Sequence, residues 1–189
     1  MRQGVRNWRV WCGLLGGLSL AACAPTFNWR LVPFESTPVQ AMLPCKPERA
    51  SREVPTPSQS KTQLQMASCD VDDQVFALSV MAWPVPNPSP EALATAARQW
   101  LRAHWARLGV MPPADTDMPT GWQASPWQVK DAEWSGVWQG PAKDHQGRVI
   151  QAQLGLTYQN GVWLQLGQYS PKFDLTAWEA MRDAVQWNR

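Results

Sequence analysis

Residues 149–169, VIQAQLGLTYQNGVWLQLGQY, constrain the fold more than any other part of the chain. Apolar residues alternate with polar or small ones from Ile150 to Tyr158, which is the period of a strand with one buried face. Asn160-Gly161 follows, and this pair favours the tight turn of a two-residue hairpin. Residues 162–169 are again strand-like, so the sequence predicts an antiparallel hairpin.

Other strand-like segments precede this hairpin. Residues 74–83 are apolar on both faces, which predicts a central strand. The VDDQ turn joins that strand to the alternating segment 62–69 and predicts a second hairpin. Proline-rich segments predict connecting loops at 51–61 and 84–90. Further strands are expected at 27–32, 40–44 and 133–140, and a further loop at 110–126.

A helix is predicted over residues 89–108. Ser89 is a good N-cap, Pro90 suits the first helical position, and Glu91 places an acid in the first turn. Gly109 marks the end of the helix. One face of this helix collects the residues expected to be buried: Leu93, Ala97, Trp100, Leu101, His104 and Leu108.

A second helix is predicted over about 174–187, near the end of the chain. Thr176 and Glu179 have the spacing of a capping box. Its apolar stripe contains Leu175, Trp178, Met181 and Val185. Strands dominate and helices occur in two separate places, so the sequence predicts an α+β fold: a mostly antiparallel sheet with two flanking helices.

The first 22 residues have the composition of a secretory signal peptide. Arg2, Arg6 and Arg9 make the start basic, and twelve uncharged residues follow. This apolar run is shorter than the roughly 20 residues that a membrane-spanning helix needs. Small residues at its end complete the pattern of a cleaved export signal.

Leu20-Ala21-Ala22-Cys23 resembles the lipobox of bacterial lipoproteins. The resemblance implies cleavage before Cys23 and attachment of acyl chains such as palmitate to its thiol and new amino group. Leu20-Ala21-Ala22 would also serve an ordinary signal peptidase. Ala24, where some lipoproteins carry aspartate, favours the outer membrane, facing the periplasm. We therefore expect a signal peptide at 1–22, an anchor and short tether at 23–35, and one α+β domain within 27–189.

Charge and cysteine content restrict the exported chain further. Three of the 17 basic residues lie in the signal, which leaves 14 against 15 acidic residues and gives no reason to expect a nucleic-acid partner. With Cys12 removed and Cys23 acylated, Cys45 and Cys69 remain in an oxidising compartment and predict a disulfide. A metal site is the weaker alternative, because the chain has no CxxC motif and its two histidines stand far apart.

Tryptophan is the unusual component of the composition, with 13 residues in all. Four of them crowd into segment 122–138. Tryptophan beside glutamine suits a glycan or peptide surface, because the indole offers a flat apolar face and an N–H donor. The alternative is that these side chains fill the core. The candidate ligand surface consists of Trp122, Trp127, Trp134 and Trp138.

No catalytic, metal or cofactor motif is present, so no catalytic residue, metal ligand or cofactor is predicted. His104 is expected to lie on a buried helix face and His145 in a solvated turn. Asp72, Asp73, Asp115 and Asp117 are expected to be loop acids without a calcium-binding pattern. Lys46, Arg49 and Arg52 form a basic group that could contact an anion such as a lipid phosphate, or simply be solvated.

The mature chain also resembles a group of uncharacterised proteobacterial lipoproteins. Leu43-Pro44-Cys45-Lys46-Pro47 corresponds to an FPxKP-like segment in that group, and the order of strands and helices is similar. The resemblance implies a PsbP-like α/β/α sandwich over about 27–187. It implies no reaction.

Two functions are compatible with these features. The first is a non-enzymatic binding or assembly factor, held at the membrane by its acyl chains, with an envelope protein as partner. The second is a glycan-binding module or cell-wall-active enzyme that uses segment 122–138. The absence of a paired-carboxylate or metal motif in the sequence favours the first.

Overall fold

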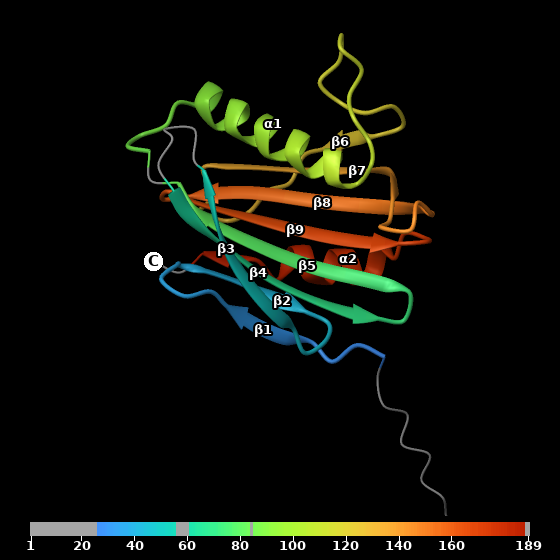
Figure 1. The fold of residues 1–189 in the computed structure, drawn as a ribbon. Coiled ribbons are helices and arrows are strands. Elements are labelled where there is room, and N and C mark those ends of the chain that lie inside the picture. The colour runs from blue at the N-terminus through green and yellow to red at the C-terminus, as the bar shows by residue number, and fades with distance from the viewer. Residues whose placement is uncertain (1–25, 56–60, 84, 188–189) are drawn as a thin grey trace, which may run out of the picture.

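The structure is a computed structural model, and it describes residues 26–55, 61–83 and 85–187. The described residues form ten strands and two helices, so the fold is broadly α+β but mostly β. Three layers are visible in Figure 1: helix α1, a large sheet, and a layer made of a small sheet and helix α2.

The large sheet has seven strands and is antiparallel throughout. Both predicted hairpins are confirmed, because β4 pairs with β5 and β8 pairs with β9. In spatial order the strands are β3 (Glu48–Pro55), β4 (Lys61–Val71), β5 (Gln74–Ala82), β9 (Val162–Ser170), β8 (Val149–Gln159), β7 (Trp134–Lys143) and β6 (Gln123–Ser125).

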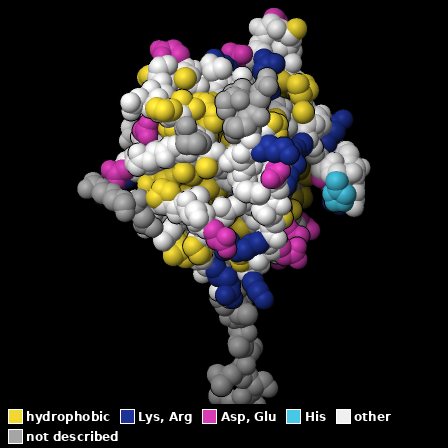
Figure 2. All heavy atoms as spheres, turned by 60° about the vertical axis from the view of Figure 1, so that its left-hand side comes forward, with side chains coloured by type: hydrophobic (Ala, Val, Ile, Leu, Met, Phe, Trp, Pro, Cys, Tyr) yellow, Lys and Arg dark blue, Asp and Glu magenta, His cyan; other side chains and the backbone are white. Residues whose placement is uncertain are grey.

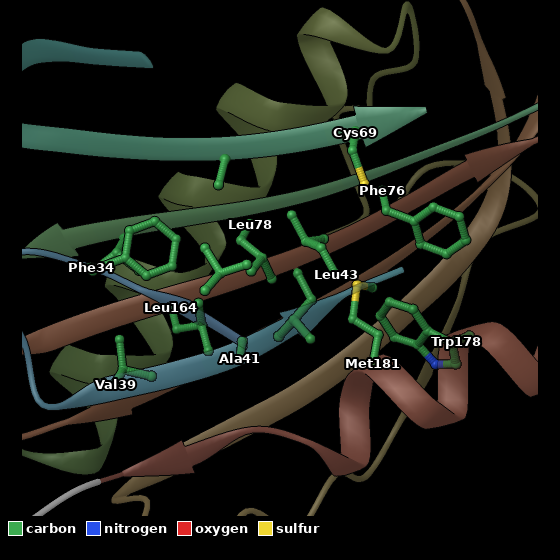
Figure 3. Packing of buried hydrophobic residues seen from close by; sticks show 14 of the residues in the cluster. Phe34, Val39, Ala41, Leu43, Cys69, Phe76, Leu78, Leu164, Trp178 and Met181 are labelled. Atoms are coloured by element: carbon green, nitrogen blue, oxygen red, sulfur yellow. The ribbon is translucent and has the colours of Figure 1, made fainter. Parts of the chain in front are cut away.

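A small sheet covers one face of the large sheet. It contains β1 (Arg30–Pro33), β2 (Val39–Leu43) and β10 (Gln186–Trp187), with β2 in the middle. Figure 3 shows the apolar side chains of β2 facing those of β5 and β9, with α2 (Leu175–Asp183) beside them. This core includes Val39, Ala41, Leu43, Phe76, Leu78, Leu164, Trp178 and Met181.

Helix α1 (Pro90–Arg107) covers the opposite face of the large sheet. Its predicted start is confirmed, since the Ser89 side chain accepts a hydrogen bond from the Ala92 backbone N–H at 3.2 Å. Leu108 caps the end, and Gly109 follows with φ +66°, a conformation that glycine adopts readily. Among the described residues, no helix is long and apolar enough to cross a membrane.

The second helix is shorter than predicted. It ends at Asp183, and residues 186–187 instead form β10 on the edge of the small sheet. Asp174 caps its start by accepting a hydrogen bond from the Ala177 N–H at 3.0 Å, in place of the expected Thr176–Glu179 box. Leu175 is 57% exposed, so it does not belong to the buried stripe.

Two segments that were predicted to be loops contain strands. Residues 51–55 continue β3, which pairs along its whole length with β4 despite its polar composition. This strand lies at the edge of the sheet, where charged residues and proline are tolerated because one side of the backbone needs no strand partner. Residues 123–125 form β6 at the other edge.

The predicted Cys45–Cys69 disulfide is formed, with Cα atoms 5.9 Å apart. Cys45 follows β2 of the small sheet and Cys69 lies in β4 of the large sheet, so the bond joins two layers. Its sequence separation is 24 residues. Closing a loop of that length restricts the unfolded chain by roughly 3 kcal/mol on the entropic model.

Large aromatic side chains lie over glycines of the large sheet. Trp122 packs so closely over Gly140 that a Cβ at this glycine would meet the indole Cγ at 2.5 Å. On the other face, a Cβ at Gly155 would lie 3.1 Å from Trp127. Position 140 therefore requires glycine, because the indole of Trp122 leaves no room for a side chain.

We predict that Gly140→Ala destabilises the protein only while Trp122 is present. The added methyl group should cost about 1–3 kcal/mol of unfolding free energy through overpacking. In a Trp122→Ala background the same change should cost far less. Urea unfolding of the wild type, both single variants and the double variant measures this coupling. An equal cost of Gly140→Ala in both backgrounds would contradict the packing explanation.

Candidate functional site

The four tryptophans of segment 122–138 do not form one surface. Trp122 is 5% exposed and packs under α1, where its ring centroid lies 5.5 Å from that of Trp105. Its indole N–H donates to the Pro141 carbonyl at 2.9 Å. Trp127 is 8% exposed and belongs to the core on the other side of the large sheet. Both side chains therefore serve packing.

Trp134 and Trp138 are partly buried and stack on each other, with centroids 5.9 Å apart and planes 17° from parallel. They extend an aromatic cluster beneath α1 that the sequence did not reveal. Its centre is Trp163 on β9, which is 1% exposed. Rings around Trp163 lie at centroid distances of 4.9 Å for Tyr158, 5.5 Å for Trp134, 6.1 Å for Trp83 and 6.3 Å for Trp100.

One side of this cluster is open. Trp83, Trp100 and Trp163 line a groove of about 330 Å³ together with Met81 and residues of α1. We call it the aromatic groove. Figure 2 shows hydrophobic side chains gathered on the side of the molecule where α1 begins. The groove is thus an accessible aromatic surface, although two of its three tryptophans are themselves mostly covered.

Polar groups of α1 border the aromatic groove. Gln99 lines it, and beyond Trp83 it continues along Thr95 and Glu91. Hydrogen bonds from its own backbone N–H and from the Ser89 hydroxyl lower the pKa of the Glu91 carboxyl, which therefore stays ionised at neutral pH. An aromatic floor with amide, hydroxyl and carboxylate groups at its edge can bind an amphipathic ligand.

A partly buried chain of hydrogen bonds holds α1 against β9 next to the groove. The indole N–H of Trp100 donates to the Gln165 Oε1, which turns the amide Nε2 toward His104. This Nε2 lies 3.2 Å from the His104 Nδ1, and the Tyr169 hydroxyl lies 2.7 Å from the His104 Nε2. Because the amide donates to Nδ1, the neutral imidazole carries its proton on Nε2 and donates to Tyr169.

Burial, with a smaller contribution from the charge of Arg107, lowers the pKa of His104 from its ordinary 6.5 to about 4. Burial likewise raises the pKa of Tyr169. Both groups are therefore neutral at physiological pH. The arrangement fixes the position of α1 on the sheet, which agrees with the sequence prediction that His104 lies on a buried helix face.

The basic group and the acids of loop 110–126 are dispersed, whereas Asp72, Asp73 and His145 line one cleft near the end of α1. Arg49 and Arg52 lie on opposite faces of the large sheet because they are an odd number of residues apart on β3. Arg49 donates to the Pro33 carbonyl at 3.0 Å. Asp117 lies 3.7 Å from Arg102 in an exposed ion pair. Within the part of the chain that is described, no group of three or more His, Cys, Asp or Glu side chains could hold a metal ion.

Comparison with protein families and with curated proteins found no match. The predicted lipidation residue, Cys23, lies outside the described residues. Trp83, Trp100 and Trp163 were missed as site residues because they are far apart in the sequence. The only local signal was their place at the ends of predicted strands or on a helix face, and that signal does not distinguish a groove from a core.

We predict that His104 makes the protein less stable in acid. In the unfolded chain histidine binds a proton below about pH 6.5, whereas folded His104 does so only below about pH 4. Unfolding free energy should therefore fall as the pH drops through this window, by roughly 3 kcal/mol at its acid end. His104→Gln should remove that part of the slope in urea unfolding measured between pH 7 and 4.

His145→Gln is the matched control, because His145 lies exposed in a turn. It should keep the full wild-type dependence on pH. A His104→Gln variant with an unchanged slope would contradict burial of a neutral imidazole.

Proposed function

We propose that this chain is a lipid-anchored protein of the cell envelope that binds a partner without catalysing a reaction. The observation that carries the proposal is the distribution of cysteines. Cys45 and Cys69 are joined in a disulfide, a bond typical of exported proteins. Removal of residues 1–22 leaves Cys23 as the one remaining thiol, and it stands at the lipobox position.

The geometry of the domain is compatible with such an anchor. Arg30, the start of β1, is seven positions after Cys23, so an extended tether spans at most about 25 Å. Figure 1 shows β1 and the small sheet on the side of the large sheet away from α1. A domain tethered through β1 therefore has its small-sheet layer nearest the anchor, and α1 lies on the side facing away.

The anchor is tested by Cys23→Ser in cells, with Cys12→Ser as the matched control. We expect Cys23→Ser to move the protein from the detergent phase to the aqueous phase in a phase partition, because stable membrane attachment requires the acyl chains. Cys12→Ser changes a thiol inside the signal and should have no effect. Mass spectrometry of the mature N-terminus showing an unmodified Cys23 would overturn the proposal.

The aromatic groove is the surface we assign to the partner. An envelope protein is the first candidate. A glycan is the second, and it is favoured by the polar groups of Gln99, Thr95 and Glu91 beside an aromatic floor, since sugars combine apolar faces with hydroxyl groups. The surface differs from the predicted segment 122–138, of which only Trp134 and Trp138 join the same aromatic cluster.

Ala96→Arg tests the groove, because Ala96 lines both of its parts. We expect the larger side chain to fill the groove and abolish partner binding. Because Ala96 is partly buried against the aromatic cluster, urea unfolding checks that the variant domain remains folded. Ala103→Arg, at an exposed position of the same helix, is the matched control.

Both variants are compared by crosslinking in cells and by cosedimentation with isolated peptidoglycan. Loss of a crosslinked protein with Ala96→Arg alone supports an envelope protein as partner. Loss of saturable peptidoglycan binding with Ala96→Arg alone supports a glycan. Equal behaviour of the two variants in both assays would exclude the groove as the binding surface.

A further inference from the structure

A second cleft, of about 710 Å³, lies at the opposite end of α1 from the aromatic groove. Four segments surround it: the last turn of α1, the β4–β5 turn, the β7–β8 turn and the end of β9. Val75, Ile150 and Tyr169 give it a largely apolar floor, and Val75 is paired directly with Tyr169 across β5 and β9. The volume lies within the range of small-molecule sites.

Opposite charges line the two sides of this cleft. Asp70, Asp72 and Asp73 come from the β4–β5 hairpin and are all exposed. The other side carries Lys143 and Arg148 from the β7–β8 hairpin.

In the sheet these two hairpins lie on either side of β9, so the end of β9 separates the acidic wall from the basic wall. Arg107 of α1 adds a further cation to the lining.

The two walls do not neutralise each other. Arg148 is held by Asp144 of its own hairpin, at 2.6 Å. Among the ion pairs of the described residues, none joins the acidic wall to Arg107 or Lys143. The carboxylates of the acidic wall and the cations of Arg107 and Lys143 therefore remain available to a ligand that lies between them. A ligand with one negative and one positive group satisfies both walls, and an apolar side chain on that ligand matches the floor.

We propose that this cleft binds a small zwitterion, an amino acid or short peptide with free ends. Its carboxylate is bound by Arg107 and Lys143, and its ammonium group by Asp70 and Asp73. Charge-assisted hydrogen bonds of this kind are the strong ones in proteins. The apolar side chain rests on Val75 and Ile150. This site is separate from the aromatic groove and does not depend on lipidation of the chain.

The test is calorimetric titration of the purified full chain in detergent with alanyl-leucine and with leucine. We expect saturable binding of at least one of them. The N-acetyl derivative of that ligand lacks the ammonium group and its amide derivative lacks the carboxylate. Each derivative should bind about tenfold more weakly, the loss expected for one charge-assisted hydrogen bond.

The site is assigned by two variants and two controls. Lys143→Gln should weaken the zwitterion about tenfold, the loss expected for a hydrogen bond to a charged group, and should reduce the penalty of masking the carboxylate. Asp70→Asn should also weaken binding of the zwitterion about tenfold, and it should reduce the penalty of masking the ammonium group. Lys46→Gln and Glu179→Gln change exposed charges outside the cleft and should bind as the wild type does.

Several results would overturn the proposal. Equal affinity for the N-acetyl derivative would mean that the basic wall alone binds anions. A zwitterion site in this cleft would be excluded if the control variants lost as much affinity as the cleft variants. It would also be excluded if neither ligand showed saturable binding. Failure here leaves the lipid anchor and the aromatic groove unaffected, because their tests use other residues and other ligands.

Discussion

Burial of both faces of β9 is the constraint on which the other layers depend. Leu164 and Leu166 point to the small sheet and α2, whereas Trp163 and Gln165 point to α1. The two faces of β9 differ in the chemistry of their side chains. The small-sheet side is apolar, and the α1 side combines an aromatic anchor with a polar group that orients the helix. One strand therefore fixes the position of both covering layers.

On the α1 side the polar contacts are few and directional, and the apolar contacts are many. An apolar face alone would let a helix slide, because hydrophobic contact has no preferred direction. The Trp100–Gln165–His104–Tyr169 chain adds specific partners at fixed positions. The aromatic groove lies at one end of this contact and the charged cleft at the other. Both hollows are consequences of a helix held in one place over a wider sheet.

Local patterns in the sequence predicted the parts of the fold that depend on neighbouring residues. The Asn160-Gly161 hairpin, the Ser89 cap and the Cys45–Cys69 bond are confirmed for this reason. Strand β3 was missed because its polar sequence is stabilised only by pairing with β4, and β10 because it pairs with the distant β2. The aromatic groove was missed on the same ground, since the pairing of β5 with β9 brings Trp83 and Trp163 together and the packing of α1 on the sheet adds Trp100.

The disulfide also determines how the molecule bears mechanical load. Force applied at the N-terminal end enters through β1 and β2, which are held to the large sheet mainly by side-chain packing. The covalent bond from Cys45 to Cys69 passes that force to β4, a strand paired on both sides. Tension on the residues before Cys45 is therefore carried by the central part of the sheet, and the edge strand β3, which follows Cys45 in the chain, is bypassed.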